Sequence, residues 1–163
     1  MLNIMPQGDN ILDVDLTKPE NCIFIPVNCK GIMGAGLALD FKKMYPTLAE
    51  LYTHFCKSGN MYTGDPSIVS NIFNDTISQS GCGSVVLFPT KNDWWNLSQL
   101  NWIRDGLLRL ACEPYHARWR KQTHNIHIPK LGCGLGSLDW ADVRPLIVRF
   151  AEMMPQHEIY LYE

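Results

Sequence analysis

Short apolar runs alternate with helical patterns along the chain, and this alternation restricts the fold more than any other feature. The strand-like runs, rich in β-branched and aromatic residues, are residues 2–5, 22–27, 67–73, 84–88, 125–128 and 158–162. Several are continuously apolar, as in strands that are covered on both faces. The alternation predicts an α/β fold with a mostly parallel sheet, in which ligands bind at the carboxyl ends of the strands.

Helical periodicity fills the gaps between these runs. Apolar side chains recur at helical spacing over residues 37–45, and Pro46 ends that pattern. The next helix is expected to begin at Thr47 as N-cap and to end near Gly59. Two further apolar stripes predict helices over residues 100–110 and 143–154. The segments 74–83 and 113–123 are expected to be surface loops.

The composition fits a single domain. A chain of 163 residues matches the usual domain length of about 100–200 residues, so we expect one domain over residues 1–163. Its 14 Lys and Arg against 16 Asp and Glu give a net charge of −2, which excludes nucleic-acid binding by bulk positive charge. The sequence has no apolar run of about 18 residues and no basic-then-apolar leader. We therefore expect a cytoplasmic monomer without membrane contact.

A glycine-rich segment follows the second strand-like run. Residues 28–36 read Asn-Cys-Lys-Gly-Ile-Met-Gly-Ala-Gly and lead into the first predicted helix. Glycines let backbone N–H groups approach a ligand, and a helix N-terminus carries about half a positive charge, so this junction favours a phosphate. Its spacing matches neither the P-loop nor the dinucleotide fingerprint. Tight strand-to-helix packing is the alternative interpretation.

Two more segments are predicted at the same edge of the sheet. Residues 132–137 repeat the glycine-rich pattern after the fifth strand-like run, and Asp139 or Asp142 is placed to cap the helix that follows. Two such loops could hold a diphosphate from two sides. Lys91 follows the fourth run; partly buried, its amine could act as a nucleophile or acid–base group, whereas a solvated amine would only attract phosphate.

Other reactive groups form no recognisable site. The six cysteines contain no C-x-x-C pair and, without an export signal, are expected to be free and mostly buried. Cys112 and the histidines at 116, 124 and 127 fit no usual zinc spacing, so neither a metal nor a cofactor is expected. Residues 115–121 mix basic and aromatic side chains, which suits either a solvated loop or a local contact with nucleic acid.

Together these segments resemble the macrodomain family, whose members bind ADP-ribose. The resemblance is greatest to the branch of terminal ADP-ribose glycohydrolases and DNA ADP-ribosyl glycohydrolase antitoxins. It rests on residues 28–38, 88–91 and 132–140, and it extends from Gly8-Asp9-Asn10-Ile11-Leu12 to the last strand. It implies a three-layer α/β/α macrodomain with a mixed, mostly parallel central sheet.

The resemblance implies a role for each matching residue. Lys91 matches the catalytic lysine of this branch, and Asn28 matches an asparagine that assists at the distal ribose. Asp9 matches an acidic residue that accepts a hydrogen bond from the adenine amino group. The residues implied to bind ADP-ribose are Asp9, Asn10, Gly31, Ile32, Met33, Gly34, Ala35, Gly36, Thr90, Gly132, Cys133, Gly134, Leu135, Gly136 and Ser137.

The implied function is an ADP-ribosyl glycohydrolase that removes ADP-ribose from DNA or protein. An ADP-ribose-1″-phosphate phosphatase and a reader that binds ADP-ribose without turnover are the alternatives. The protein-directed glycohydrolases carry an aspartate where this chain has Gly136, which agrees better with the DNA-directed branch. That branch, however, follows its lysine with basic residues and a histidine, where this chain has Asn-Asp-Trp-Trp at 92–95. The target therefore stays open between DNA and protein, although the two tryptophans could stack on a base.

Overall fold

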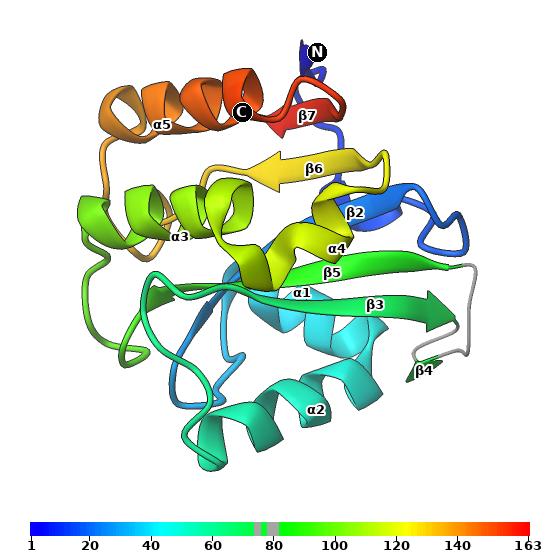
Figure 1. The fold of residues 1–163 in the computed structure, drawn as a ribbon. Coiled ribbons are helices and arrows are strands. Elements are labelled where there is room, and N and C mark those ends of the chain that lie inside the picture. Colours follow the sequence, from blue (N-terminus) through cyan, green and yellow to red (C-terminus); the bar gives the residue numbers. More distant parts are fainter. Residues whose placement is uncertain (74–75, 78–81) are drawn as a thin grey trace.

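The computed structural model describes residues 1–73, 76–77 and 82–163, which form one sheet between layers of helices (Figure 1). The strands are β1 (Leu2–Ile4), β2 (Asn21–Asn28), β3 (Ser67–Phe73), β4 (Thr76–Ile77), β5 (Gly83–Lys91), β6 (Asn125–Pro129) and β7 (Glu158–Tyr162). The α-helices are α1 (Gly36–Met44), α2 (Pro46–Lys57), α3 (Leu100–Cys112), α4 (Ala117–Arg120) and α5 (Trp140–Met153). Two 3₁₀ turns, η1 (Ile11–Asp13) and η2 (Pro114–His116), complete the described elements.

The sheet is mixed and mostly parallel, as predicted. Its strand order is β1-β7-β6-β2-β5-β3-β4. The neighbours from β1 to β5 pair in parallel, whereas β3 is antiparallel to both β5 and β4. The carboxyl ends of the five parallel strands therefore share one edge of the sheet, toward which the β5 and β6 arrows point on the left of Figure 1.

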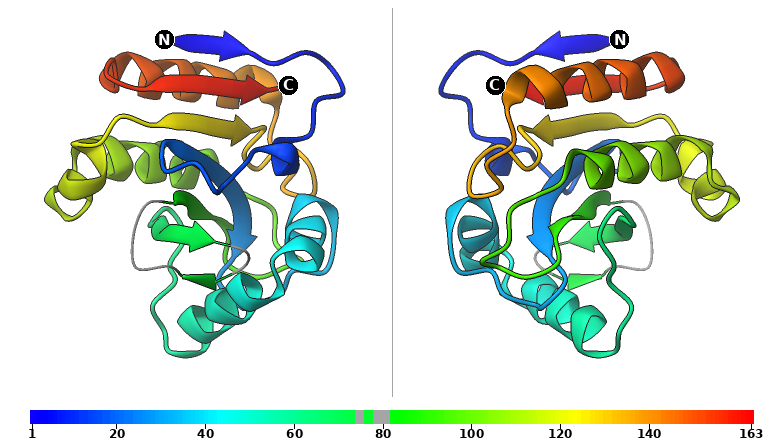
Figure 2. Two further views of the ribbon diagram at one scale, coloured as in Figure 1. Left: turned by 90° about the vertical axis from the view of Figure 1, so that its right-hand side faces the viewer. Right: turned by 90° about the vertical axis from the view of Figure 1, so that its left-hand side faces the viewer.

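Helices cover both faces of the sheet, which confirms the predicted three-layer arrangement. Figures 1 and 2 show α3 and α5 on one face and α1 and α2 on the other. Successive side chains of a strand point to opposite faces. Phe24 and Phe88 accordingly belong to the core beneath α3 and α5, while Ile25 and Leu87 belong to the core beneath α1 and α2. This double burial explains why the strand-like runs are apolar throughout.

The predicted helices are present with ends within three residues of those expected, but the N-cap of α2 differs. This helix begins at Pro46, with Tyr45 as its N-cap, so the prediction of Thr47 as N-cap is wrong. Proline suits the first helical position because its φ is fixed near the helical value and its missing N–H would have no partner there. The expected end is confirmed, since Gly59 has a φ of 72° just after the last turn.

Residues 113–123 are not a solvated loop, contrary to expectation. They fold into η2 and α4, and the Trp119 side chain is buried. Because they directly precede β6, they lie at the amino ends of the parallel strands, opposite the edge at which ligands were expected. This segment is therefore not part of the edge that carries the two glycine loops.

Three smaller expectations are also settled by the structure. Most of the expected loop over 74–83 lies outside the described residues, but Thr76–Ile77 form β4 and Gly83 begins β5. All six thiols are free, yet only Cys22 is buried, so the expectation of mostly buried thiols is wrong. In the described part of the chain, no helix is long and apolar enough to cross a membrane.

Candidate functional site

Asn28 and Lys91 face each other at the carboxyl edge of the sheet. Asn28 is the last residue of β2 and Lys91 the last residue of β5, and the two are Cα partners across these parallel strands. A bulge between Val27 and Asn28 shifts the register just before the pair. The two glycine loops, residues 28–36 and 130–139, follow β2 and β6 at the same edge. The structure thus brings together the three segments that the sequence singled out.

The buried Asn28 side chain organises the first glycine loop. Its Oδ1 accepts a hydrogen bond from Lys30 N at 2.9 Å, and its Nδ2 donates to Ile32 O at 2.6 Å. The Tyr52 hydroxyl on α2 donates to Asn28 O at 2.8 Å and lies 2.9 Å from Asn28 Oδ1. Burial raises the pKa of Tyr52, so its hydroxyl stays a donor. Ile32 O accepts one of the two protons on Nδ2.

The Lys91 amine reaches from the end of β5 to the second glycine loop. We call the carboxyl edge of the sheet between the two glycine loops the crevice. Its Nζ donates a hydrogen bond to Leu135 O. The side chain is half-buried, and this burial lowers the pKa of Lys91 from its ordinary value. A larger fraction of the amine is therefore neutral, and nucleophilic, than in a fully solvated lysine.

The second glycine loop has no room for a side chain at Gly136. A Cβ built there would lie 2.3 Å from both Gly132 O and Ser98 Oγ. The loop is closed onto the residues after β5, because Ser98 N donates to Gly136 O at 3.0 Å. A Cβ at Gly134, in contrast, would meet nothing within 4 Å. The aspartate that the protein-directed branch carries at the Gly136 position is thus incompatible with this loop conformation.

The two helix N-termini beside the loops differ. The α1 helix begins at Gly36 after Ala35, which makes no side-chain cap, so its first N–H groups are left for a ligand. The α5 helix is capped by Asp139, whose carboxylate accepts from Ala141 N at 2.8 Å. Of the two acidic residues considered for this cap, Asp139 is the one used. An anion is therefore favoured at the start of α1, whereas the start of α5 already holds a carboxylate.

The remaining predicted residues lie at the same edge with different exposure. Asp9 follows β1 and is exposed, and Asn10 caps η1 by accepting from Leu12 N at 3.0 Å. The exposed members of the predicted set are Asp9, Asn10, Ile32, Gly34, Ala35, Gly36, Gly134, Leu135 and Ser137. The buried or half-buried members are Asn28, Gly31, Met33, Thr90, Lys91, Gly132, Cys133 and Gly136.

The thiols and metal-ligating residues near the crevice supply no second reactive centre. Burial raises the pKa of Cys29 to about 12 and also raises the pKa of Cys133, so both thiols remain protonated. Within residues 1–73, 76–77 and 82–163, no group of three or more His, Cys, Asp or Glu is arranged to hold a metal ion. Lys91 is therefore the nucleophile candidate that the crevice offers.

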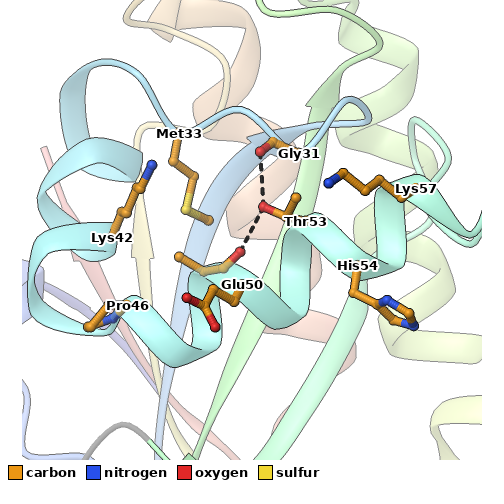
Figure 3. Close-up of a pocket in the computed structure, with 9 residues that line it drawn as sticks. Gly31, Met33, Lys42, Pro46, Glu50, Thr53, His54 and Lys57 are labelled. Atoms are coloured by element: carbon orange, nitrogen blue, oxygen red, sulfur yellow. Dashed lines mark hydrogen bonds between the residues drawn. The ribbon is translucent and has the colours of Figure 1, made fainter.

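A cavity of about 420 Å³ lies between the first glycine loop, α1 and α2 (Figure 3). It lies on the side of this loop that faces α2, and no residue of the second glycine loop lines it. Thr53 closes one wall, with Oγ1 3.1 Å from Gly31 O and 3.0 Å from Ala49 O. The sequence interpretation missed both Tyr52 and Thr53, whose hydroxyls hold the loop from α2. A buried tyrosine needs a partner for its hydroxyl, and that need is the available signal in the sequence.

The fold is an α/β/α domain in which two glycine loops and a strand-end lysine lie at one edge of the sheet. Comparison with known families gives the same result, because the macro domain model matches residues 25–147. The chain belongs to the macro domain family.

Relatives and solved structures agree with this assignment. The DNA ADP-ribosyl glycohydrolase of Mycobacterium tuberculosis is 34% identical over 136 residues, which cover 83% of this chain and 36% of the relative. The chain thus spans about a third of that relative's length. The macrodomain of Mycobacterium tuberculosis DarG superimposes with a TM-score of 0.81 at 29% identity, covering 99% of this chain and 97% of that one. The structure of Thermosipho africanus DarTG in complex with ADP-ribose superimposes with a TM-score of 0.75 at 30% identity. The match covers 94% of this chain and 40% of that chain.

Proposed function

We propose that this chain, as one domain over residues 1–163, is an ADP-ribosyl glycohydrolase that releases ADP-ribose from DNA. The observation that carries the proposal is the position of the Lys91 amine, which bridges from the end of β5 to Leu135 O in the second glycine loop. A ligand held between the two loops has this amine beside it. An amine with a lowered pKa at that point suits attack on a sugar carbon.

The diphosphate would be held by backbone N–H groups at the uncapped start of α1 and in both glycine loops. Such a site needs hydrogen-bond donors and does not need a net positive charge. Asp9 would accept from the adenine amino group. The second Nδ2 proton of Asn28 would orient a hydroxyl of the distal ribose or the attacking water, which is positioning and not proton transfer.

The chemistry begins when the neutral Lys91 Nζ donates its lone pair to C1″ of the distal ribose. The bond from C1″ to the carrier breaks through an oxocarbenium-like state, and the carrier leaves with the electron pair and takes up the proton that Nζ loses on bonding to C1″. Water then adds at C1″ and gives its proton to Nζ, which leaves as the free amine and releases ADP-ribose.

Two observations favour DNA over protein as the carrier. The second loop excludes a side chain at Gly136, and therefore the acidic residue of the protein-directed branch. Relatives from Mycobacterium tuberculosis and Thermus aquaticus are named DNA ADP-ribosyl glycohydrolase, at 34% and 30% identity. This chain covers 36% and 39% of those two relatives, so each name belongs to a longer protein.

A turnover assay tests the proposal directly. Thymidine-linked, glutamate-linked and 1″-phosphate ADP-ribose are offered to the same preparation, and release of ADP-ribose from the thymidine-linked substrate is expected. Lys91→Ala should abolish release while ADP-ribose still binds in calorimetry. Lys43→Ala, which removes an exposed lysine on α1, is the matched control and should leave release unchanged. Phosphate release alone would identify a phosphatase, and binding without any turnover would identify a reader.

A further inference from the structure

Exposed apolar side chains occur on the segment after β5 and on both glycine loops. Trp94, Trp95 and Leu97 follow β5 and are 56%, 63% and 64% exposed. Leu135 from the second glycine loop is 67% exposed, and Ile32 from the first is 44% exposed. We call these five residues the apolar rim. Large apolar side chains that are exposed together, and not singly, mark a binding surface.

The two tryptophans occupy the tip of a tight turn. Asn96 N donates to Asp93 O at 3.2 Å, and Asp93 N donates to Asn96 Oδ1 at 3.1 Å. Trp94 and Trp95 are therefore the central residues of a β-turn that is closed by two hydrogen bonds. Such positions are usually filled by Gly, Pro, Asn, Asp or Ser, so the turn itself does not need indoles. The rings lie 5.3 Å apart at an interplanar angle of 90°.

This turn is fixed to both glycine loops. Cys29 N donates to Asn92 O at 2.9 Å, which ties the turn to the first loop. Lys30 forms an ion pair with Asp93 at 3.8 Å beside it. Ser98 N donates to Gly136 O at 3.0 Å, which ties the same segment to the second loop. The backbone that carries the two indoles is thus fixed to both loops before any ligand arrives, which reduces the entropic cost of binding.

We propose that Trp94 and Trp95 form a stacking platform for unpaired nucleobases next to the ADP-ribosylated nucleotide. This inference rests on the proposed function. The carrier is attached to ADP-ribose beside Lys91, so it must extend out of the crevice next to this residue. Trp94 is three residues further along the chain, and three residues span at most about 11 Å, so Trp94 lies within that distance of Lys91. Perpendicular rings offer separate faces to bases that no longer stack on each other. They suit a strand whose modified nucleotide has been turned out of the stack.

Size and charge favour bases over a protein surface as the occupant. Two indoles contribute at most about 500 Å² of contact, whereas a stable protein interface needs about 800 Å² from each partner. One or two bases match the smaller area. The nearby Lys30 is paired with Asp93, and the chain carries a net charge of −2, so binding would depend on stacking more than on phosphate contacts.

The test compares three substrates: a single-stranded oligonucleotide with one ADP-ribosylated base, the same ADP-ribosylated nucleoside without flanking bases, and an ADP-ribosylated peptide. Trp94→Ala and Trp95→Ala should each lower kcat/KM about tenfold on the oligonucleotide and less than twofold on the nucleoside. Trp94→Phe should keep most of the activity, because a phenyl ring still stacks. Leu108→Ala, at an exposed apolar residue of α3, is the matched control and should leave kcat/KM unchanged on all three substrates.

Binding measurements keep this inference separate from the proposed function. In a Lys91→Ala background, the ADP-ribosylated oligonucleotide should bind about tenfold more tightly than free ADP-ribose, and Trp94→Ala should remove that difference. If the oligonucleotide binds no more tightly than ADP-ribose, the platform is refuted even where turnover is observed. Equal losses on nucleoside and oligonucleotide, or a loss confined to the peptide, would also refute it. If the wild-type protein shows no turnover but the oligonucleotide still binds more tightly than free ADP-ribose, only the proposed function is refuted.

Discussion

At the scale of single residues, the conformation of the second glycine loop requires glycine at position 136. A methyl group there would be pressed against Gly132 O, which belongs to the backbone and has no flexible side chain to move aside. We expect Gly136→Ala to lower the free energy of unfolding by about 1–3 kcal/mol, the usual cost of overpacking. ADP-ribose affinity should fall at least tenfold because the loop must open. Urea unfolding and calorimetry measure the two effects.

Gly134→Ala is the matched control in the same loop. Its added methyl group meets nothing within 4 Å, and the residue is exposed. A change below about 0.5 kcal/mol in stability is expected, as for most surface substitutions. If Gly136→Ala binds ADP-ribose as tightly as the wild type, the loop can move without weakening the binding site.

Tyr52 is expected to act on the crevice through Asn28. Tyr52→Phe removes the hydroxyl donor to Asn28 O and leaves this oxygen with the long contact from Cys56 Sγ at 3.9 Å, so we expect a loss of about 1–3 kcal/mol of stability. As a positioning change it should lower kcat more than it weakens ADP-ribose binding. Tyr62→Phe, at an exposed tyrosine, is the control and should change neither value. If kcat and the ADP-ribose affinity of the folded protein fall by the same factor, Tyr52 has a purely structural role.

The sequence could place Asn28 and Lys91 but not the residues that hold them. Each of the two ends an apolar strand, and carboxyl ends of parallel strands share an edge, so their proximity follows from the strand pattern. Tyr52 lies on an apolar helical stripe, where periodicity reports burial and says nothing of the hydroxyl. The steric limit at Gly136 depends on Ser98, which lies 38 positions earlier in the chain.

At the scale of elements, the contact between α3 and β5 depends on Gly106. A Cβ at this position would lie 2.5 Å from Phe88 Cζ, and the Phe88 ring is fully buried against Phe24. Alanine is favoured over glycine in a helix by about 1 kcal/mol, but the overpacking cost of about 1–3 kcal/mol should exceed this gain. We therefore expect Gly106→Ala to be less stable than the wild type in urea unfolding.

Combining Gly106→Ala with Phe88→Leu tests whether the clash with the Phe88 ring causes the loss of stability. A shorter side chain at position 88 vacates the place of the added methyl group, so the double variant should lose less stability than the sum of the single variants. A Gly106→Ala variant that is more stable than the wild type would show that α3 is free to move away from β5.

Elements whose pattern arises within one segment were predictable, and those fixed by distant contacts were not. The strands over 67–73 and 158–162 were predicted with the bounds that the structure has. Residues 113–123 read as a polar loop, yet Trp119 stacks on His124 with ring centroids 4.9 Å apart and on His157 at 5.8 Å. That last partner precedes β7, and nothing in the local sequence indicates the pairing.

At the scale of the whole molecule, the sheet separates the crevice from a buried aromatic cluster. The crevice lies at the carboxyl ends of the parallel strands, whereas Trp119, His124 and His157 stack at the amino ends of β6 and β7. The cluster is buried, and within the described part of the chain Trp119 Nε1, His124 Nδ1 and His157 Nε2 have no hydrogen-bond partner. Acid should therefore act first on stability at the amino edge and not on the chemistry at Lys91.

Burial, the neighbouring His124 and the N-terminal ammonium lower the pKa of His157 to about 4, and burial lowers that of His124. An unfolded histidine has a pKa of about 6.5. Between these values the unfolded chain binds more protons than the folded chain, so stability should rise from pH 4 to pH 6.5 and level off above it. The His157 Nδ1 already accepts from His124 N at 3.1 Å, so a proton there would also break that hydrogen bond.

His157→Asn tests this origin of the pH dependence, because its side-chain oxygen can replace Nδ1 as acceptor but cannot take up a proton in this range. The slope of the free energy of unfolding between pH 4 and 6.5 should fall by up to about 1.4 kcal/mol per pH unit, the value for one proton. His124 and the buried His127, whose pKa is lowered to about 4, should keep part of the slope. His54→Asn, at an exposed histidine of α2, is the control and should leave the slope unchanged. An unchanged slope in His157→Asn would assign the acid sensitivity to other groups.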